Sequence, residues 1–274
     1  MCKVCTTKFE PHHDKAVAEK GTFWVPGQTL RVKFVDKNQK RENYFRSAMG
    51  EWLKWANLKV EYVASGNCEI TVGFEDGWSA SYVGTDSLAH VKTENTLNLG
   101  WDGLDVALHE IGHALGLGHE HQNPLGGIQW NRKAVIKDLS GPPNNWSVSE
   151  IEFNVLNAYS PSEVVNTPMD KNSIMMYSFP SSWTTNGFSA PWNQILSQLD
   201  KDFISTIYPF PITVEPPVGT SAVAEFAKAL FKQKSEVSAL NKPTVIRLGT
   251  LLGANFDAKS TKSYIVEAIW ELLK

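Results

Sequence analysis

The segment His109–His119, HEIGHALGLGH, contains three histidines and a glutamate. Its first two histidines are four residues apart. On a helix that advances about 100° per residue, side chains at this spacing lie about 40° apart and roughly 6 Å along the axis. The imidazoles of His109 and His113 can therefore reach one metal ion from the same face. Glu110 flanks that ion, and its carboxylate can accept a proton from an attacking water.

A third ligand requires the chain to turn sharply after this helix. Gly116 tolerates a positive φ, so it can end the helix and let His119 return to the same ion. Three neutral nitrogens leave one coordination position for water, which is typical of a catalytic zinc site. Packed histidines in a buried helix are the alternative, but a chance match in a chain of this composition is on the order of 10⁻⁵. A structural or degenerate zinc site is a second alternative.

A second motif, Ser173–Tyr177 (SIMMY), lies downstream. Together the two motifs resemble the metzincin metallopeptidases, whose signature is H-E-x-x-H-x-x-G-x-x-H followed by a Met-turn. The resemblance implies that Met175 forms a hydrophobic floor beneath the zinc ligands. It also implies that Tyr177 can ligate zinc at rest and swing to stabilise the oxyanion. Taken alone, Met175 would indicate only core filling.

Within the metzincins the chain is most similar to the astacins, over roughly Thr22 to Pro211. Glu120 follows the third histidine as in that group, and His121–Pro124 is also similar. In mature astacins this glutamate contacts the N-terminus that propeptide removal frees. Glu120 is therefore expected either to form that salt bridge or to form local hydrogen bonds that fix the end of the motif. The implied fold is an α/β (α+β) domain, with a twisted mixed sheet and helices above a cleft and a loop-rich lower subdomain. Substrate would extend along an irregular edge strand near Ser79 to Leu88.

Hydrophobic periodicity predicts the regular elements of this domain independently. A period of two indicates strands, a period near 3.6 indicates helices, and their order favours a mixed sheet backed by helices. Asp102 is predicted to cap the helix that begins near Leu104, and Ser197 and Asp200 resemble a capping pair for the last helix. The predicted strands are Thr29–Val35, Lys59–Val63, Glu69–Phe74 and Thr96–Trp101, and the predicted long helices lie in Gln39–Leu58 and Leu196–Tyr208.

Changes in composition divide the chain into four parts. Residues 1–21 form an N-terminal segment in which Cys2, Cys5 and Asp14 suggest a latency device, the alternative being a disordered terminus. Residues 22–211 form the catalytic domain, and residues 212–220 form a proline-rich linker. Residues 221–274 contain three periodic segments that predict a small all-α C-terminal bundle, either a stabilising appendage or a partner-binding module.

Overall composition narrows the classes of function. The chain has 274 residues, a net charge of -3 and a pI near 6.2, so it gives no electrostatic reason to expect nucleic acid. No segment is predicted to span a membrane. Three cysteines are too few for a disulfide framework. The first twenty residues lack the apolar core of a secretory signal, although the function favours an extracellular location.

The sequence therefore predicts a Zn²⁺-dependent endopeptidase that acts on protein or peptide substrates as a monomer. His109, His113 and His119 are the predicted ligands, and Glu110 is the predicted general base and later the proton donor to the leaving amine. The alternative is a catalytically silent metzincin-fold protein whose C-terminal helical module recognises a partner. Proteolysis that a chelator abolishes and zinc restores would distinguish the two.

Overall fold

The structure is a computed structural model that describes residues 21–142, 144–162, 164–165, 167–210, 234–239, 244–245, 248–249 and 262–272. The chain divides into two compact units, Met1–Phe210 and Pro211–Lys274. In the part of the chain so described, no helix is long and apolar enough to cross a membrane. The predicted N-terminal segment, the linker and the first periodic segment of the C-terminal bundle lie outside the described residues, apart from Gly21 and Lys234.

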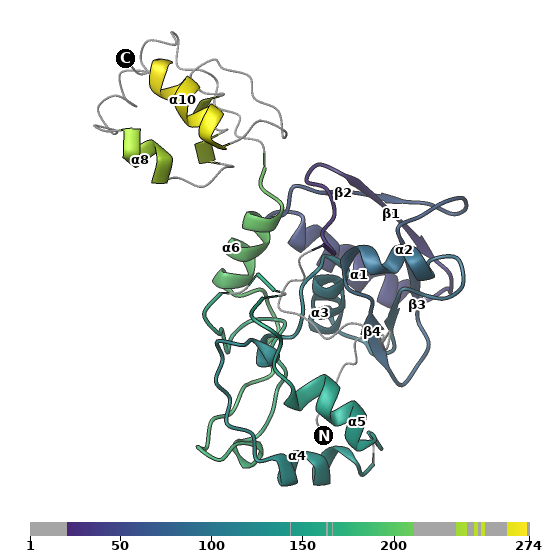
Figure 1. The fold of residues 1–274 in the computed structure, drawn as a ribbon. Coiled ribbons are helices and arrows are strands. Elements are labelled where there is room, and N and C mark those ends of the chain that lie inside the picture. Colours follow the sequence, from purple (N-terminus) through teal and green to yellow (C-terminus); the bar gives the residue numbers. More distant parts are fainter. Residues whose placement is uncertain are drawn as a thin grey trace. The chain divides into compact units, whose positions relative to one another are not determined.

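A five-stranded mixed sheet lies in the part of the first unit that also holds α1 and α3 (Figure 1). The strand order is β2-β1-β3-β5-β4. Neighbouring strands are parallel except for β4, which runs antiparallel to β5. The mixed sheet expected from the sequence is thus confirmed. The strands are β1 Thr29–Phe34, β2 Lys59–Tyr62, β3 Ile70–Gly73, β4 Ser79–Ser81 and β5 Leu97–Leu99.

Two helices pack together and position the functional site. Helix α1 (Gln39–Trp52) begins at Asn38, whose side chain accepts a hydrogen bond from the Arg41 backbone N–H. Helix α3 (Leu104–Ala114) lies against it. The Trp52 indole N–H donates to the Leu108 carbonyl at 2.9 Å, which links the two helices inside the core. The inward residues of α1 follow the predicted helical spacing: Phe45, Ala48, Met49 and Trp52 are all buried.

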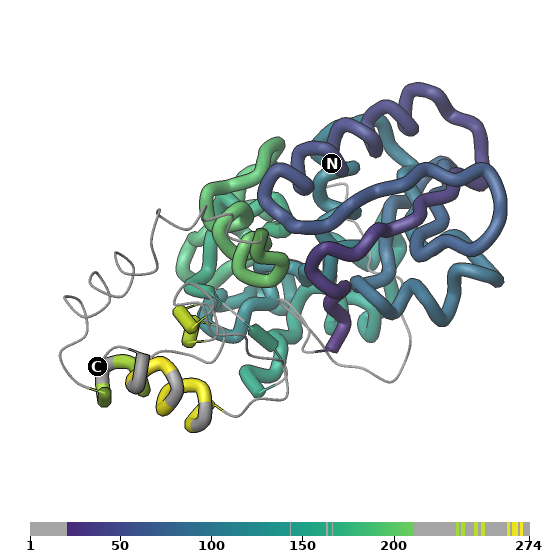
Figure 2. Tube along the Cα trace, turned by 90° about the horizontal axis from the view of Figure 1, so that it is seen from above, coloured from purple at the N-terminus to yellow at the C-terminus, as the bar shows by residue number. Residues whose placement is uncertain are grey.

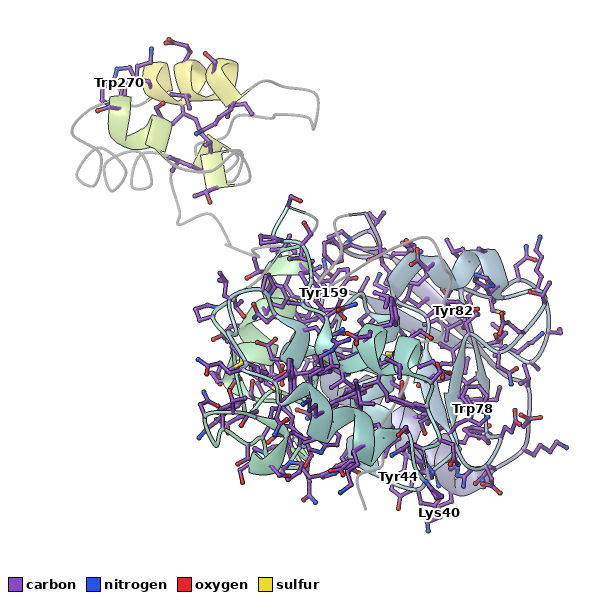
Figure 3. All side chains as sticks on the ribbon, turned by 60° about the horizontal axis from the view of Figure 1, so that its bottom comes forward. Lys40, Tyr44, Trp78, Tyr82, Tyr159 and Trp270 are labelled. Atoms are coloured by element: carbon purple, nitrogen blue, oxygen red, sulfur yellow. The ribbon has the colours of Figure 1, made fainter. Side chains whose placement is uncertain are left out.

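The predicted cap of α3 by Asp102 is wrong. Gly103 is the N-cap residue and no side chain caps this helix. The Asp102 carboxylate instead accepts hydrogen bonds from Lys40 Nζ at 2.8 Å and Arg41 Nε at 3.0 Å. Ionic hydrogen bonds from α1 to the residue before Gly103 are thus found in place of a local capping bond. Figure 3 shows the Lys40 side chain beside Tyr44, one turn further along α1.

The edge strand is shorter than predicted. Only Ser79–Ser81 forms strand, flanked by Trp78 and Tyr82, which are labelled in Figure 3. The chain then enters a 3₁₀ turn (Gly84–Asp86) and the short helix α2 (Ser87–His90). Backbone bonds within the turn, such as Asp86 N–H to the Val83 carbonyl, replace strand pairing there.

The lower part of the first unit contains short helices in irregular chain. Helix α5 continues directly into a π-helical turn. A second hydrophobic cluster, separate from the core under the sheet, holds this part together. The loop-rich lower subdomain implied by the resemblance agrees with these short elements. They are α4 Arg132–Leu139, α5 Val148–Ile151 and the π-helix Glu152–Leu156.

Helix α6 (Gln198–Ile207) returns to the early elements of the described chain. The predicted Ser197–Asp200 pair is confirmed as a capping box. In Figures 1 and 2 the green helix α6 lies beside the purple early segments. Tyr208, directly after α6, donates its hydroxyl to the Leu115 carbonyl at 2.7 Å, and its own carbonyl accepts from Asn57 N–H at 2.9 Å. The end of the unit is thus tied to the end of α3.

The second unit contains helices α8 (Lys234–Ala239) and α10 (Lys262–Leu272), which contact each other. Val237 of α8 and Ile265 and Ile269 of α10 are buried, as is Val245 between them. The last of the three periodic segments is Ser263–Leu273, and helix α10 covers all of it except Leu273, so the helix predicted there is found.

Candidate metal centre

Three histidines converge at the end of α3. His109 and His113 lie one turn apart on that helix, and His119 follows the turn beyond it. His113 Nε2 lies 3.2 Å from His109 Nε2 and 3.1 Å from His119 Nε2. All three side chains are buried. Within the described ranges, this is the one cluster of three or more potential metal ligands.

The other ring nitrogens orient two of the imidazoles. His109 Nδ1–H donates to the Ile174 carbonyl at 2.8 Å, and His113 Nδ1–H donates to the Leu117 carbonyl at 2.7 Å. Because a neutral imidazole carries one N–H, these bonds leave each Nε2 unprotonated, with a lone pair available to a metal ion. The converging nitrogens of these two rings are therefore two acceptors facing each other, an arrangement that is repulsive unless a cation lies between them.

Burial keeps these rings neutral. Desolvation lowers the pKa of His109 to about 4. It also holds the pKa values of His113 and His119 well below the ordinary histidine value, with a further contribution from the neighbouring histidines. At neutral pH the site therefore offers uncharged nitrogen donors, as zinc requires. The donor set and its geometry fit a zinc ion.

Gly116 makes the turn between the second and third histidines. Its φ is +94°, which disfavours any residue with a Cβ. Gly116 N–H donates to the His113 carbonyl at 2.7 Å, and Leu117 N–H donates to the Gly112 carbonyl at 2.9 Å. The same turn presents the Leu117 carbonyl to His113 Nδ1. The expected helix end at Gly116 is therefore found where the sequence motif requires it.

Glu110 lies fully buried on α3 and lines a cleft together with His109 and Tyr177. The cleft encloses about 520 Å³, including space open to solvent. It is bordered by α3, the chain after β5, the Ser173–Tyr177 motif and the segment before α6. Its residues are Trp101, Asp105, Val106, His109, Glu110, Ile174, Met176, Tyr177, Ser178, Trp192 and Asn193.

Met175 packs directly against α3 at Gly112, a residue to which the sequence motif assigns no role. A Cβ on Gly112 would overlap the Met175 sulfur and would lie 3.3 Å from the Trp52 ring. Met175 is itself buried and belongs to the hydrophobic core under the sheet, the upper cluster. Met176 belongs to the second cluster, in the lower part of the unit. Gly112 thus permits the close approach of the two motifs, and its only signal in the sequence is a glycine inside a helix.

Asp200 anchors the segment that orients His109. Its carboxylate accepts from Ser173 Oγ at 2.6 Å and from Ile174 N–H at 2.8 Å. The Ile174 carbonyl in turn accepts from His109 Nδ1. From the sequence, Asp200 is predicted only as part of a capping box, because no local pattern connects it to Ser173 or Ile174, 27 and 26 positions earlier.

Tyr177 lies close to the third histidine. Its ring centroid is 4.3 Å from that of His119 and 6.1 Å from that of His109. The Tyr177 ring also stacks on that of His121, with ring centroids 4.2 Å apart. His121 is buried and donates from Nε2 to the Asn154 carbonyl at 2.9 Å, within the π-helical turn. His121 is therefore a neighbour of the site and lies outside the ligand cluster, as does His90.

Glu120 forms local hydrogen bonds. Its Oε1 accepts from Asn123 Nδ2 and from Asp170 N–H, each at 2.9 Å. Its backbone N–H donates to the Met175 carbonyl at 2.9 Å. Burial raises the pKa of this carboxyl to about 7. These contacts tie the end of the zinc motif to the Met175 segment.

Comparison with known proteins agrees with this geometry. The family described as "Astacin", a peptidase family, matches residues 16–206. The structure titled "Structure of myroilysin" shares 36% sequence identity and has a TM-score of 0.68, covering 71% of this chain and 99% of that chain. A second, "Crystal structure of myroilysin", shares 33% identity with a TM-score of 0.57, covering 76% and 92%. A search of curated proteins found no match.

The family match spans more than half of the chain and includes both motifs. The three converging histidines provide the metal ligands that such a peptidase needs. The chain therefore belongs to the astacin family of zinc metallopeptidases.

Proposed function

We propose that this enzyme hydrolyses internal peptide bonds of proteins, with Glu110 as the general base. The main support for this role is that Glu110 lines the same cleft as the metal ligand His109 and is the next residue on the same helix. His109, His113 and His119 would hold the zinc ion. When bound there, zinc supplies a Lewis acid that acidifies water and polarises a peptide carbonyl.

In this proposal Glu110 moves the proton. Its carboxylate takes a proton from the attacking water and delivers it to the leaving amine when the peptide bond breaks. Glu110 is fully buried, so the cleft excludes bulk water from the carboxylate and strengthens its interactions with the reacting groups. A purely structural role would not require a carboxylate at this position.

Tyr177 and the surrounding residues would complete the machinery. The Tyr177 ring lies 4.3 Å from the His119 ring, close enough for its hydroxyl to serve the oxyanion after a rotation of the side chain. Met175 would support the two helical ligands from below, Gly116 would make the turn to the third, and Glu120 would fix the end of the motif. Each role agrees with the contacts of that residue.

Substrate would lie extended beside β4, an edge strand of the sheet that contacts α3. A peptide there would add a strand through main-chain hydrogen bonds. Peptidases of this family are typically secreted, and we infer that this one acts on extracellular proteins as a monomer.

The test is Glu110→Gln, assayed on casein and on an internally quenched peptide. We expect the variant to bind zinc as the wild type does while turnover falls by about 10²–10⁴-fold. Glu61→Gln removes an exposed carboxylate on β2 and serves as the control, with activity unchanged. Wild-type activity should disappear with a chelator and return with zinc. Undiminished turnover in the zinc-loaded Glu110→Gln protein would eliminate the general-base role.

A further inference from the structure

The cleft contains a side-chain pocket next to the groups proposed to react. Beyond His109 and Glu110 it is bounded by Trp101, Asp105 and Trp192. Since Glu110 is proposed to act at the scissile bond, a substrate side chain adjacent to that bond would enter this pocket. The inference below therefore rests on the proposed function.

The chemistry of the pocket is that of an apolar site with one added acid. Trp101, Val106 and Ile174 supply apolar surface, and Ser178 and Asn193 are polar but uncharged. None of the residues that line the cleft is a lysine or an arginine. Apart from Glu110, the one lining residue with a carboxylate is Asp105. An acidic substrate side chain would therefore find no positive partner among these residues.

Asp105 and Trp192 form a fixed pair at this pocket. The Trp192 indole N–H donates to Asp105 Oδ2 at 2.5 Å, joining the first turn of α3 to the segment before α6. Trp192 is 43% exposed, although tryptophan is one of the largest apolar side chains. The hydrogen bond holds an exposed indole ring with a carboxylate beside it. An aromatic face combined with a carboxylate is well suited to a cationic group, through cation–π attraction and ion pairing.

A second tryptophan–aspartate pair in the chain, Trp183 with Asp138, has a structural role and serves for comparison. Trp183 donates its indole N–H to Asp138 Oδ2 at 2.8 Å, but Trp183 is buried in the lower hydrophobic cluster. There the carboxylate satisfies a buried donor. Trp192 is exposed, so its N–H could be satisfied by water, and the pair with Asp105 is not needed for that purpose. Asp105 also lies where an acid stabilises a helix N-terminus, a role that would not require Trp192 or the pocket.

We propose that Asp105 and Trp192 make this pocket a subsite for a lysine or arginine side chain, so that the enzyme prefers to cleave bonds with a cationic residue adjacent to them. The tryptophan faces contact the aliphatic stem of such a side chain. The Asp105 carboxylate pairs with its charged end. Specificity then comes from α3 itself, one turn before the first metal ligand.

The test uses internally quenched peptides that differ at one residue beside the scissile bond. Lysine is compared with norleucine, which has the same aliphatic stem but no charge, and with glutamate; mass spectrometry of the products locates the cleaved bond. We expect kcat/KM for lysine to exceed that for norleucine about tenfold, as expected for one charge-assisted contact in a partly open site. Glutamate should be the poorest of the three.

Two variants and a control test which residues cause the preference. Asp105→Asn keeps a hydrogen-bond acceptor for Trp192 and should reduce the lysine-to-norleucine ratio to near one. Trp192→Leu keeps apolar bulk and should reduce the same ratio. Asp138→Asn changes the structural pair and should leave the ratio at the wild-type value. A ratio near one in the wild type, or an unchanged ratio in Asp105→Asn, would overturn the inference.

A binding measurement separates this inference from the proposed function. The dissociation constants of the lysine and norleucine peptides are measured by fluorescence anisotropy in the Glu110→Gln protein and in the Glu110→Gln, Asp105→Asn double variant. We expect tighter binding of the lysine peptide only when Asp105 is present. If the zinc-loaded wild type cleaves no peptide, the proposed function fails, and the binding ratio still decides whether the pocket selects a cation.

Discussion

At the scale of single residues, the orientation of the metal ligands depends on the hydrogen bonds and the close packing of the residues around them. His109 uses Nδ1 to bind the Ile174 carbonyl and so aims Nε2 at the other two histidines. Gly112, on the next turn, has no side chain, and the Met175 sulfur occupies that space. The ligands are thus oriented by hydrogen bonds on one side and by close packing on the other.

Gly112→Ala tests this packing. Alanine usually stabilises a helix relative to glycine by about 1 kcal/mol, but here the added methyl overlaps the buried Met175. We expect a net loss of about 1–3 kcal/mol in unfolding free energy, together with weaker zinc binding. Urea denaturation and zinc titration measure the two effects.

Gly50→Ala is the matched control. Gly50 also lies inside a helix, α1, but a Cβ there would meet nothing within 4 Å. This variant should be more stable than the wild type by up to about 1 kcal/mol and should bind zinc normally. If both glycine variants gained stability equally, the close approach of Met175 to α3 would have no energetic significance.

At the scale of elements, α6 reaches the metal site through the Ser173–Tyr177 motif. Asp200 in its first turn binds Ser173 Oγ and Ile174 N–H, and Ile174 binds His109. The same carboxylate also accepts from Ser197 N–H in the capping box. A single acid therefore fixes both the start of the last helix and the segment behind the first ligand.

Asp200→Asn should weaken zinc binding by about 10–100-fold, the usual effect of losing a residue that orients a metal ligand. The carboxylate accepts through one oxygen from Ser173 and through the other from Ile174, whereas an amide has a single acceptor oxygen, so the variant loses one of these two acceptors. Competition with a metal-binding dye measures the affinity. Asp202→Asn, an exposed site on the same helix, should retain wild-type affinity; an equal loss in both variants would show a general effect of charge on α6.

A second link between elements predicts how stability depends on pH. Glu69 accepts hydrogen bonds from Arg31 Nε, Nη2 and backbone N–H, between β1 and the start of β3. The side-chain hydrogen bond from Arg31 is the main cause that lowers the pKa of Glu69 below 4.5. The stabilisation is therefore present above the ordinary carboxyl pKa and is lost as the pH falls through the lower native value.

Glu69→Gln should remove about 1 kcal/mol of stability at neutral pH, a modest amount because Arg31 is partly exposed. The difference between variant and wild type should shrink as the pH is lowered below 4.5, the unperturbed glutamate value. Urea midpoints at several pH values measure this difference. Glu75→Gln, at an exposed position after β3, is the control. A difference that stays constant down to the lowest pH would contradict the assignment.

At the scale of the whole molecule, the metal site lies at the boundary between two hydrophobic clusters. Met175 packs in the upper cluster and Met176 in the lower one. His109 and His113 belong to α3, whereas His119 begins the chain that leads into the lower part. A zinc ion would therefore join segments that the two clusters hold separately.

Removing the metal should destabilise the enzyme as a whole. A ligand at 100 times its dissociation constant adds about 2.7 kcal/mol to the free energy of unfolding. We expect a chelator to lower the melting temperature measured by calorimetry, and added zinc to restore it. In His113→Ala the same chelator should have little effect. A melting temperature independent of zinc in the wild type would contradict this linkage.

The sequence predicted those features that depend on spacing along the chain. The four-residue interval between His109 and His113, the glycine turn at Gly116 and the capping box at Ser197 are all local patterns, and each is found. The cap at Asp102 was wrong because the carboxylate meets Arg41, 61 residues earlier, on a packed neighbouring helix. Such a contact depends on tertiary packing, which local propensity does not contain.

The same reason explains what was missed at the site. The contact between Gly112 and Met175 and the bonds from Asp200 to the Ser173 and Ile174 segment join residues far apart in sequence. The Asp105–Trp192 pair spans 87 positions. Sequence motifs identify the candidate metal ligands. The residues that position those ligands can be identified only from tertiary contacts in the folded chain.

We expect the three imidazoles to hold one zinc ion and to leave one coordination position open to solvent. Zinc K-edge absorption spectroscopy of the purified full chain, combined with its metal content, tests this most directly. We expect one zinc per chain, with three imidazole nitrogens at about 2.0–2.1 Å, and loss of that metal in His113→Ala. An unchanged zinc content in His113→Ala, or a spectrum that requires four permanent protein ligands in the active enzyme, would contradict an open site with three histidine ligands.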